Sequence, residues 1–249
     1  LINLQVMEMS EIREKFFRGG NLMQIPRKEK MKIQPFDELI QSFDRNYEYR
    51  EQEVNEVLQA VYPDYAVLRR YLVDYSYLRR TDDGSEYQVD TDVILKFYDD
   101  SYYGELEKYV LTKEDEHFSS MPLDALKSCE NNDARNMVLI IQRRQVAGVF
   151  ILQSGNIVEK YSSNPDTLVM FSYSVDSTKQ GRGVATGSFQ KLDAFVNENY
   201  EGVNEVALGV NLRNEAAQHV YKKGGFKYTG RSFIGPVGRQ KIMSKEIQG

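Results

Sequence analysis

A glycine-containing segment between a strand-like and a helix-like pattern is the part of the sequence that most clearly indicates chemistry. Residues 175–186 read Val-Asp-Ser-Thr-Lys-Gln-Gly-Arg-Gly-Val-Ala-Thr. An alternating apolar stretch typical of a strand, Val169 to Val175, precedes the segment, and a helical pattern, Val184 to Asn199, follows it. A helix N-terminus presents unpaired N–H groups and the positive end of the helix dipole, so this junction suits phosphate. Gly181 and Gly183 would let the backbone approach such a ligand closely.

Two common nucleotide-binding motifs do not fit this segment. A dinucleotide fingerprint would need a third glycine at position 186, which is Thr186. A P-loop would need Gly-Lys followed by Ser or Thr, and that sequence occurs nowhere in the chain. The predicted phosphate therefore belongs to another kind of ligand.

A second pattern follows where another strand is predicted to give way to a helix. Val206 to Val210 is predicted as the strand, and Asn214 to Lys223 as the helix, which Gly224 ends. Residues 214–226 read Asn-Glu-Ala-Ala-Gln-His-Val-Tyr-Lys-Lys-Gly-Gly-Phe. By itself Tyr221 would be interpreted as a core aromatic residue of this helix.

Together the two segments resemble the signatures of the GNAT N-acetyltransferase superfamily. Gln180 to Ala185 is similar to the family's Q/R-x-x-G-x-G/A loop, and Asn214 to Phe226 is similar to its N-x-x-A-x-x-x-Y-x-x-x-G-F pattern. The predicted order of strands and helices between Leu106 and Gly249 is also similar. The resemblance implies a mixed-sheet α/β domain with splayed central strands, acting as an acyl-CoA-dependent N-acyltransferase.

The resemblance also implies a role for individual residues. The strand that ends at Val175 would splay from the next strand, and the pantetheine arm of acetyl-CoA would lie in the gap. The backbone N–H near Val175 would polarise the thioester carbonyl, Asn214 would contact pantetheine, and Tyr221 would protonate the departing thiolate. The loop N–H groups would hold the diphosphate. The predicted catalytic residue is Tyr221, and the predicted cofactor-binding residues are Phe171, Tyr173, Val175, Gln180, Gly181, Arg182, Gly183, Val184, Ala185, Thr186 and Asn214.

These roles suit acyl transfer from a thioester. A fixed backbone donor aimed at the tetrahedral oxyanion is worth roughly 3–4 kcal/mol. A free thiol has a pKa of ~8.5 and tyrosine one of ~10, so proton donation by Tyr221 is uphill by ~2 kcal/mol. That cost is tolerable when the proton moves as the thiolate departs.

The general base is not assigned by the sequence. The family often places a glutamate on one of the two splayed strands, but residues 168–175 contain no carboxylate. Asp176, Glu205, Glu159 and a water molecule are the alternatives that the sequence leaves open.

The N-terminal part of the chain has a different pattern. Apolar residues recur at helical spacing from Phe36 to Phe43, and further helices are predicted from Glu51 and, capped by Asp64, over residues 65–75. Residues 77–89 contain an Asp-Gly turn between two short strand-like runs, which indicates a hairpin. Three helices followed by a hairpin is the winged-helix order.

The stretches Tyr49 to Leu58 and Asp64 to Tyr75 resemble a small uncharacterised bacterial domain that is often attached to winged-helix transcriptional regulators, and the resemblance covers about residues 26–89. Paired arginines lie on its third helix and its hairpin, at Arg69-Arg70 and Arg79-Arg80, where a winged helix would contact DNA phosphates. Acidic residues nevertheless outnumber basic ones between positions 27 and 90, and strong nonspecific DNA binding requires several phosphates to be neutralised. Surface ion pairing of these arginines is therefore the favoured interpretation.

Composition and length limit the remaining choices. The chain has 249 residues, 41% of them hydrophobic and 28% charged, which is typical of one or two ordinary globular domains. Its longest apolar stretches fall far short of the ~20 residues that cross a bilayer, and no secretory leader opens it, so we expect a cytoplasmic protein without a membrane partner. One cysteine and two histidines exclude an internal disulfide and a Cys-cluster or three-histidine metal site.

The sequence therefore predicts an α+β protein that transfers acetyl from acetyl-CoA to a primary amine of a small molecule or peptide, by direct attack in a ternary complex. The alternative is an acetyl-CoA-sensing transcriptional regulator or protein-binding module; DNA contact and a homodimer are left open. A further strand is predicted at Lys108 to Leu111. The predicted domains are an N-terminal extension (1–25), a winged-helix-like domain (26–90), a linker (91–105) and a GNAT domain (106–249).

Overall fold

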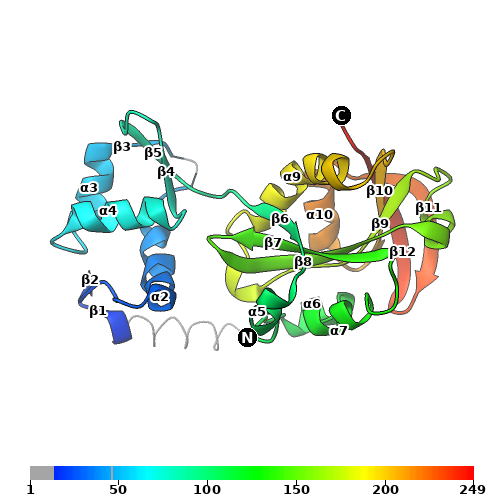
Figure 1. Ribbon diagram of the computed structural model, residues 1–249, viewed down its shortest axis with the longest axis horizontal. Coiled ribbons are helices and arrows are strands. Elements are labelled where there is room, and N and C mark those ends of the chain that lie inside the picture. The colour runs from blue at the N-terminus through cyan, green and yellow to red at the C-terminus, as the bar shows by residue number, and fades with distance from the viewer. Residues whose placement is uncertain (1–13, 46) are drawn as a thin grey trace. The chain divides into compact units, whose positions relative to one another are not determined.

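A computed structural model describes residues 14–45 and 47–249 of the chain. These residues form two units, and the boundary between the units lies between Thr91 and Asp92 (Figure 1). None of the helices within the described residues is both long and apolar enough to cross a membrane.

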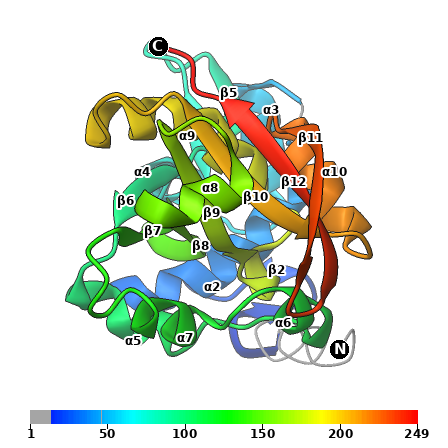
Figure 2. The same cartoon turned by 90° about the vertical axis from the view of Figure 1, so that its right-hand side faces the viewer.

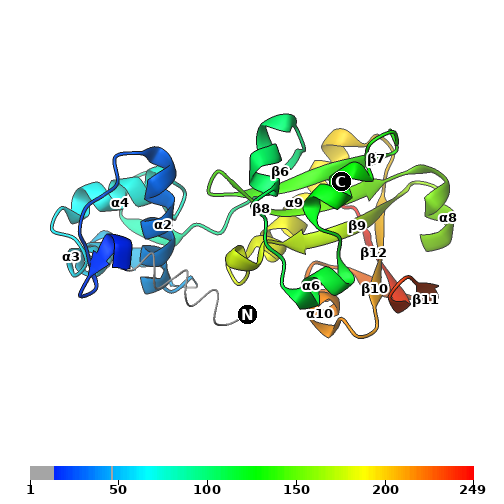
Figure 3. The same cartoon turned by 90° about the horizontal axis from the view of Figure 1, so that it is seen from below.

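Within the described residues, the N-terminal unit combines helices with a small antiparallel sheet. Figure 3 shows the helices as separate short rods joined by loops. Three of its strands form one sheet in the order β3-β5-β4, and the other two pair with each other. Its elements are β1 (Phe17–Arg18), β2 (Asn21–Leu22), α2 (Glu29–Leu39), the 3₁₀ turn η1 (Ile40–Ser42), β3 (Tyr49–Arg50), α3 (Glu51–Gln59), α4 (Tyr65–Asp74), β4 (Leu78–Arg80) and β5 (Glu86–Val89).

Local signals in the sequence explain this arrangement. The Asp64 carboxylate accepts the Val67 N–H at 3.2 Å and so caps α4, as predicted. Gly84 takes a left-handed φ of 73° in the turn between β4 and β5. The three helices and the hairpin are therefore confirmed, while the winged-helix likeness stays a prediction. Phe16 and Leu22 belong to the same buried core, so the described part of the expected extension is part of this unit; residues 1–13 lie outside the described residues.

The C-terminal unit is built on a seven-stranded sheet in the order β11-β12-β10-β9-β8-β7-β6. Among its strands, β9 and β10 pair in parallel and every other neighbouring pair is antiparallel. Figure 2 shows β11 and β12 as a long hairpin at one edge of the sheet. The strands are β6 (Ile94–Phe97), β7 (Arg135–Gln142), β8 (Gln145–Gln153), β9 (Thr167–Val175), β10 (Glu205–Asn211), β11 (Lys227–Gly235) and β12 (Gly238–Glu246).

Two expectations about the start of this unit were wrong. Residues 91–105 are not a linker, because β6 pairs with β7 and the Glu105 carboxylate accepts the Val146 N–H at 2.8 Å. The strand residues are half-buried at Leu95 and Phe97 and exposed at Ile94 and Lys96, as in an edge strand that buries one face. Lys108 to Leu111 forms no strand. Tyr109 and Leu111 are buried under the sheet in a segment without regular secondary structure. Their alternation with exposed residues therefore reflects burial against the sheet and not pairing with another strand.

Helices cover both faces of the sheet. Helices α9 (Val184–Asn199) and α10 (Glu215–Lys223) pack their apolar residues on one face. Short helices cover the other face, and Figure 1 shows α5–α7 on the opposite side of the strands from α9. The elements of the second face are η2 (Asp100–Tyr102), α5 (Tyr103–Leu106), α6 (Lys113–Phe118), α7 (Pro122–Lys127), η3 (Gly155–Ile157) and α8 (Val158–Tyr161), and η4 (Ser177–Lys179) precedes α9.

The two parallel strands separate halfway along their length. Their pairing begins at Thr167 with Glu205 and ends at Met170 with Leu208, although both strands continue. Opposite Phe150 of β8, β9 carries two residues, Ser172 and Tyr173, and Ser172 has a φ of 50°. Such a bulge bends a strand and increases its twist. We infer that the bulge turns the end of β9 away from β10. The end of the pairing at Met170 and Leu208 confirms the predicted splay of the two strands.

Gly148 lies opposite the end of β9 and has no room for a side chain. A Cβ there would sit 2.7 Å from the Ser174 carbonyl oxygen and 2.8 Å from the Ile140 Cδ1. Gly148→Ala is therefore expected to lower the free energy of unfolding by ~1–3 kcal/mol in urea titrations. The control Gly104→Ala, with nothing within 4 Å of its Cβ, should be neutral or slightly stabilising. Equal effects of the two changes would contradict the packing described here.

Candidate active site

A cavity of about 450 Å³ lies where β9 and β10 separate, bordered by Tyr173 to Val175 on one strand and Gly209 to Asn211 on the other. Helices α6, α9 and α10 and the β11–β12 hairpin complete its walls. The structure brings together ten of the predicted site residues here. They are Tyr173, Val175, Gln180, Gly181, Gly183, Val184, Ala185, Thr186, Asn214 and Tyr221.

The first turn of α9 faces this cavity with its backbone donors uncapped. Gly183 is the N-cap residue, has a left-handed φ of 82°, and no side chain caps the helix. The first helical hydrogen bond runs from the Gly187 N–H to the Gly183 carbonyl oxygen at 2.9 Å. The N–H groups of Val184 to Thr186 therefore have no partner within the helix. Gly181 also has a left-handed φ, 72°, and open space where a Cβ would lie.

The loop before α9 is fixed by its own polar groups. The Asp176 carboxylate accepts the Thr178 N–H at 2.9 Å and the Thr178 hydroxyl at 2.7 Å. Lys179 donates to the Val146 carbonyl oxygen at 2.6 Å. Arg182 donates to the Thr178 carbonyl oxygen at 2.7 Å. It is a predicted cofactor-binding residue, but it does not line the cavity. Its guanidinium therefore stabilises the loop conformation.

The free edge of β9 presents backbone groups to the gap. Val175 lies opposite Gly148, and the next residue, Asp176, donates its N–H to Ala147 of β8. Successive peptide groups of a strand point to opposite edges, so the N–H and carbonyl of Val175 point away from β8, toward the gap. The Gln180 side chain donates to the Val175 carbonyl oxygen at 3.3 Å and to Asp115 Oδ2 at 3.1 Å.

Two aromatic residues of β9 were predicted to bind the cofactor, and the structure separates them. The Tyr173 hydroxyl lies 2.8 Å from Ser188 Oγ, and its ring stacks on Phe189 at 4.9 Å, which fastens the end of β9 to α9. Phe171 instead packs against Tyr161 of α8 with ring centroids 5.6 Å apart, and it does not line the cavity. Phe171 takes part in the aromatic cluster beside α8, so its contact with the cofactor stays a prediction that the lining of this cavity does not support.

Tyr221 lies on α10 with its ring packed among other aromatic rings. The Tyr173, Phe189 and Phe226 rings each have centroids 5.9 Å from the Tyr221 ring. Tyr221 is 8% exposed and lines the cavity, and burial raises the pKa of its hydroxyl above the ordinary value of 10. Asn214 caps the same helix by accepting the Ala217 N–H at 2.9 Å.

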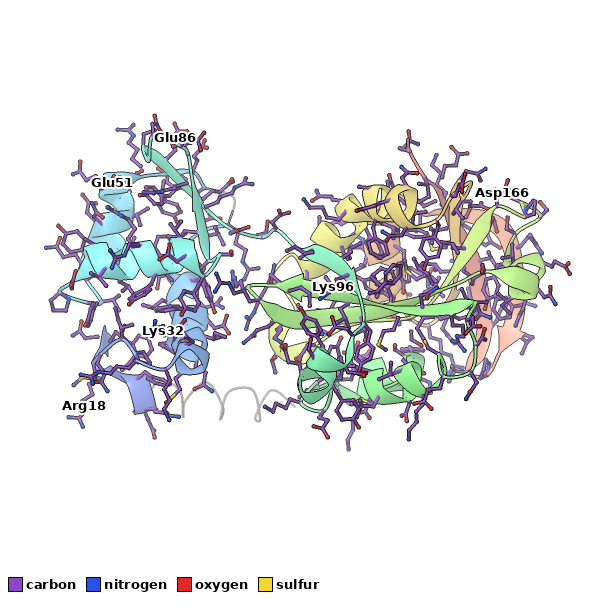
Figure 4. All side chains as sticks on the ribbon, in the orientation of Figure 1. Arg18, Lys32, Glu51, Glu86, Lys96 and Asp166 are labelled. Atoms are coloured by element: carbon purple, nitrogen blue, oxygen red, sulfur yellow. The ribbon has the colours of Figure 1, made fainter. Side chains whose placement is uncertain are left out.

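None of the three carboxylates considered as a general base lines the cavity. Asp176 is buried within the loop, and Glu159 is exposed on α8. Glu205 lies at the start of β10, where the strands still pair; Asp166, labelled in Figure 4, precedes β9 at this same end. Burial raises the pKa of the Glu205 carboxyl, but hydrogen bonds from Ser162 and Thr167 outweigh it and leave that pKa below its usual range.

Asp115 is the carboxylate that does line the cavity, and sequence reasoning missed it. Its Oδ2 accepts the Thr112 hydroxyl at 2.7 Å and the Gln180 amide at 3.1 Å. Thr112 in turn caps α6 by accepting the Asp115 N–H at 3.1 Å. The Thr-x-x-Asp spacing is a signal for a helix start, but it does not show which cavity that helix faces.

Comparison with known proteins agrees with this geometry. Residues 94–226 match the acetyltransferase (GNAT) family, and residues 21–89 match a family described as an uncharacterized protein conserved in bacteria (DUF2087). The chain therefore belongs to the GNAT acetyltransferase family, as its two motifs predicted. It is similar to the "Uncharacterized N-acetyltransferase YbbJ" of Bacillus subtilis (strain 168), with 35% identity over 153 residues, covering 61% of this chain and 96% of that protein.

Solved structures share the fold of the C-terminal unit. One is AAC(6')-Ib in complex with paromomycin and acetyl-CoA, with a TM-score of 0.51, 13% identity, and coverage of 62% of this chain and 93% of that one. Another is this aminoglycoside acetyltransferase in complex with coenzyme A and kanamycin, with a TM-score of 0.52, 14% identity, and coverage of 62% and 95%. At this level of identity the likeness supports the predicted mixed-sheet fold alone.

The buried tyrosines give a testable pH dependence. Burial raises the pKa of Tyr173 and of Tyr221, so above pH 10 unfolding releases protons that the folded chain still holds. Their contribution to stability is complete below pH 10 and is lost as the pH rises beyond it. We expect Tyr221→Phe to lose less stability than the wild type between pH 9.5 and 11.5, measured by urea unfolding. Exposed Tyr228→Phe is the control, and an identical pH dependence for both variants would contradict the burial of Tyr221.

Proposed function

We propose that this chain transfers an acetyl group from acetyl-CoA to a primary amine by direct attack in a ternary complex. The observation that carries the proposal is one cavity that joins the uncapped N-terminus of α9 to the free edges of β9 and β10. Clustered N–H donors at a positive helix end are a ready-made site for a diphosphate. An unpaired strand edge can pair with an extended arm that carries amide groups. The cavity provides both.

The residues present fit this co-substrate. The N–H groups of Val184 to Thr186 would hold the diphosphate, and the left-handed glycines would let it approach the main chain. The Val175 N–H would pair with the pantetheine arm, and Ala216, Ala217 and Val220 of α10 provide a small apolar wall beside it. Acetyl-CoA supplies an activated thioester when bound.

The chain's own groups then serve the transfer. The backbone N–H groups on the free edge of β9 would donate to the carbonyl oxygen as negative charge develops on it, an effect worth roughly 3–4 kcal/mol. As the amine nitrogen forms the new C–N bond and the C–S bond breaks, Tyr221 would give its proton to the departing thiolate. The proton lost by the nitrogen would return to the Tyr221 oxygen through water, the remaining alternative to the three carboxylates outside the cavity. Burial raises the pKa of this hydroxyl, which makes the donation more uphill than for a free tyrosine, so the proton must move as the thiolate departs. The surrounding rings fix the orientation of the hydroxyl. Holding the amine and thioester in line supplies much of the remaining acceleration.

The cavity also favours an amine over an anionic acceptor. Among the described residues that line it, Asp115 is the one with a charged side chain. Its Oδ1 has no hydrogen-bond partner within the described residues, so it is free to attract a cation.

The cytoplasmic location, the homodimer and the regulatory alternative stay predictions. Competitor-resistant DNA binding together with no turnover of any amine would favour a regulator.

Tyr221→Phe tests the assignment of the acid. Removal of the hydroxyl should slow thiol release from acetyl-CoA, with a panel of amines, by at least about tenfold, which corresponds to ~1.4 kcal/mol in the barrier. The dissociation constant for acetyl-CoA should stay within about twofold, because the ring remains in place. Tyr228→Phe is the control for loss of a hydroxyl elsewhere. Full activity of Tyr221→Phe would refute the assignment.

A matched pair of glycines tests the loop. Gly181 and Gly202 both have left-handed φ values, 72° and 78°, and both have open space at the Cβ position. Alanine in this conformation costs about 1–2 kcal/mol at either place. Only Gly181→Ala should raise the dissociation constant for acetyl-CoA, by about tenfold in calorimetry, because only Gly181 lines the cavity. Unchanged affinity in Gly181→Ala would place the diphosphate elsewhere.

A further inference from the structure

The cavity reaches both faces of the sheet through the gap between β9 and β10. Leu208 and Val210 of β10 belong to the core beneath α9 and α10. Successive side-chain positions of a strand point to opposite faces, so Gly209 and Asn211 lie on the other face, as Ala207 does in its contact with α8. The proposed diphosphate site is on the first face. An acceptor that approaches without crossing the co-substrate must therefore enter from the second face.

The walls of the cavity on this second face come from α6 and from the β10–β12 region, and most of their polar groups are occupied. Asn211 donates to the Val237 carbonyl oxygen at 2.7 Å and accepts the Arg213 N–H at 2.9 Å. Ser119 donates to the Tyr173 carbonyl oxygen at 3.5 Å. The oxygen Oδ2 of Asp115 accepts two hydrogen bonds, as described above.

Gln240 of β12 differs from these residues. It lines the same wall, opposite Asn211 in the β10–β12 register. Within the part of the chain that the structure describes, its side-chain amide has no hydrogen-bond partner, and neither of its polar atoms is buried from solvent. The amide therefore offers one unused acceptor oxygen and two unused N–H donors to the cavity.

Two glycines set the position of this amide. A Cβ at Gly209 of β10 would lie 2.5 Å from Gln240 Oε1, and a Cβ at Gly235 of β11 would lie 2.7 Å from Gln240 Nε2. The amide thus lies across the sheet between two residues that have no side chains. Any larger residue at either glycine would displace it, so the glycines and the amide form one small polar niche on the acceptor side.

We propose that Gln240 binds the acceptor and selects an amine that carries a hydroxyl group, an inference that rests on the proposed acetyl transfer. A carboxylate on the acceptor would leave the Gln240 oxygen unpaired, and an ammonium would leave its N–H groups unpaired. A hydroxyl both donates and accepts through one atom, so it can pair with the amide oxygen and one of the two N–H groups within the small niche. A bound acceptor would displace the water that reaches this amide. An acceptor that left the amide unpaired would then be penalised, which makes this contact a basis for specificity.

The test compares pairs of acceptors that differ in the hydroxyl alone. Straight-chain amino alcohols of three to six carbons are paired with alkylamines in which a methyl group replaces the hydroxyl. The values of kcat/KM are measured by thiol release at saturating acetyl-CoA, and acetyl-CoA affinity is measured separately by calorimetry. At one chain length, the amino alcohol should exceed its partner by at least tenfold.

Variants then assign that preference to the niche. Gln240→Leu should reduce the ratio to about one without changing acetyl-CoA affinity. Gly209→Ala should also lower this ratio with Gln240 still present, because the added Cβ would displace the amide, and it would also press on the Phe233 ring. Gln240→Glu, which keeps the size, should shift the preference to a diamine of the same length. Exposed Gln190→Leu on α9 is the matched control and should retain the wild-type ratio.

Each outcome decides between the two proposals. If acetyl-CoA binds, three results would overturn the role of Gln240 and leave co-substrate binding intact. They are the absence of a hydroxyl preference, the absence of turnover with every amine in the series, and a preference that persists in both Gln240→Leu and Gly209→Ala. No binding of acetyl-CoA would overturn the proposed function, and the acceptor niche with it.

Discussion

The site depends on the interruption of hydrogen bonding between two parallel strands in the middle of the sheet. Beyond Met170 and Leu208, β9 stays paired with β8 and β10 with β12, so each strand keeps one partner and exposes one edge. Unpaired backbone groups are expensive when buried, and a protein retains them where a ligand or water completes the bonding. The bulge at Ser172 bends β9, and the stacking of Tyr173 on α9 holds it there. The gap is thus built into the sheet.

The same constraint arranges the rest of the site. Because β9 ends beside the gap, the loop that follows it must turn at Gly181 and Gly183 to enter α9, and this places the uncapped first turn at one end of the cavity. Helix α10, which follows β10, places Tyr221 on the facing wall. Backbone donors, a helix dipole and one tyrosine hydroxyl therefore converge on the cavity.

Local signals in the sequence predicted the elements next to the gap well. Glycines at left-handed positions, the Asn214 cap and the apolar periodicity of α9 each act over a few residues, so one chain suffices to identify them. The bulge, the inclusion of β6 in the sheet and the place of Phe171 depend on partners outside the local sequence. Asp115 and Gln240 were missed for the same reason, because an isolated polar residue carries no pattern until the fold gives it neighbours.

The central claim is that coenzyme occupies the gap between β9 and β10, and a crystal structure of the full chain with acetyl-CoA tests it most directly. The account predicts the diphosphate at the first turn of α9, the pantetheine arm hydrogen-bonded to the Val175 N–H, and the thioester within reach of the Tyr221 hydroxyl. Coenzyme bound at any other place, or β9 and β10 paired along their whole length in that crystal, would contradict it.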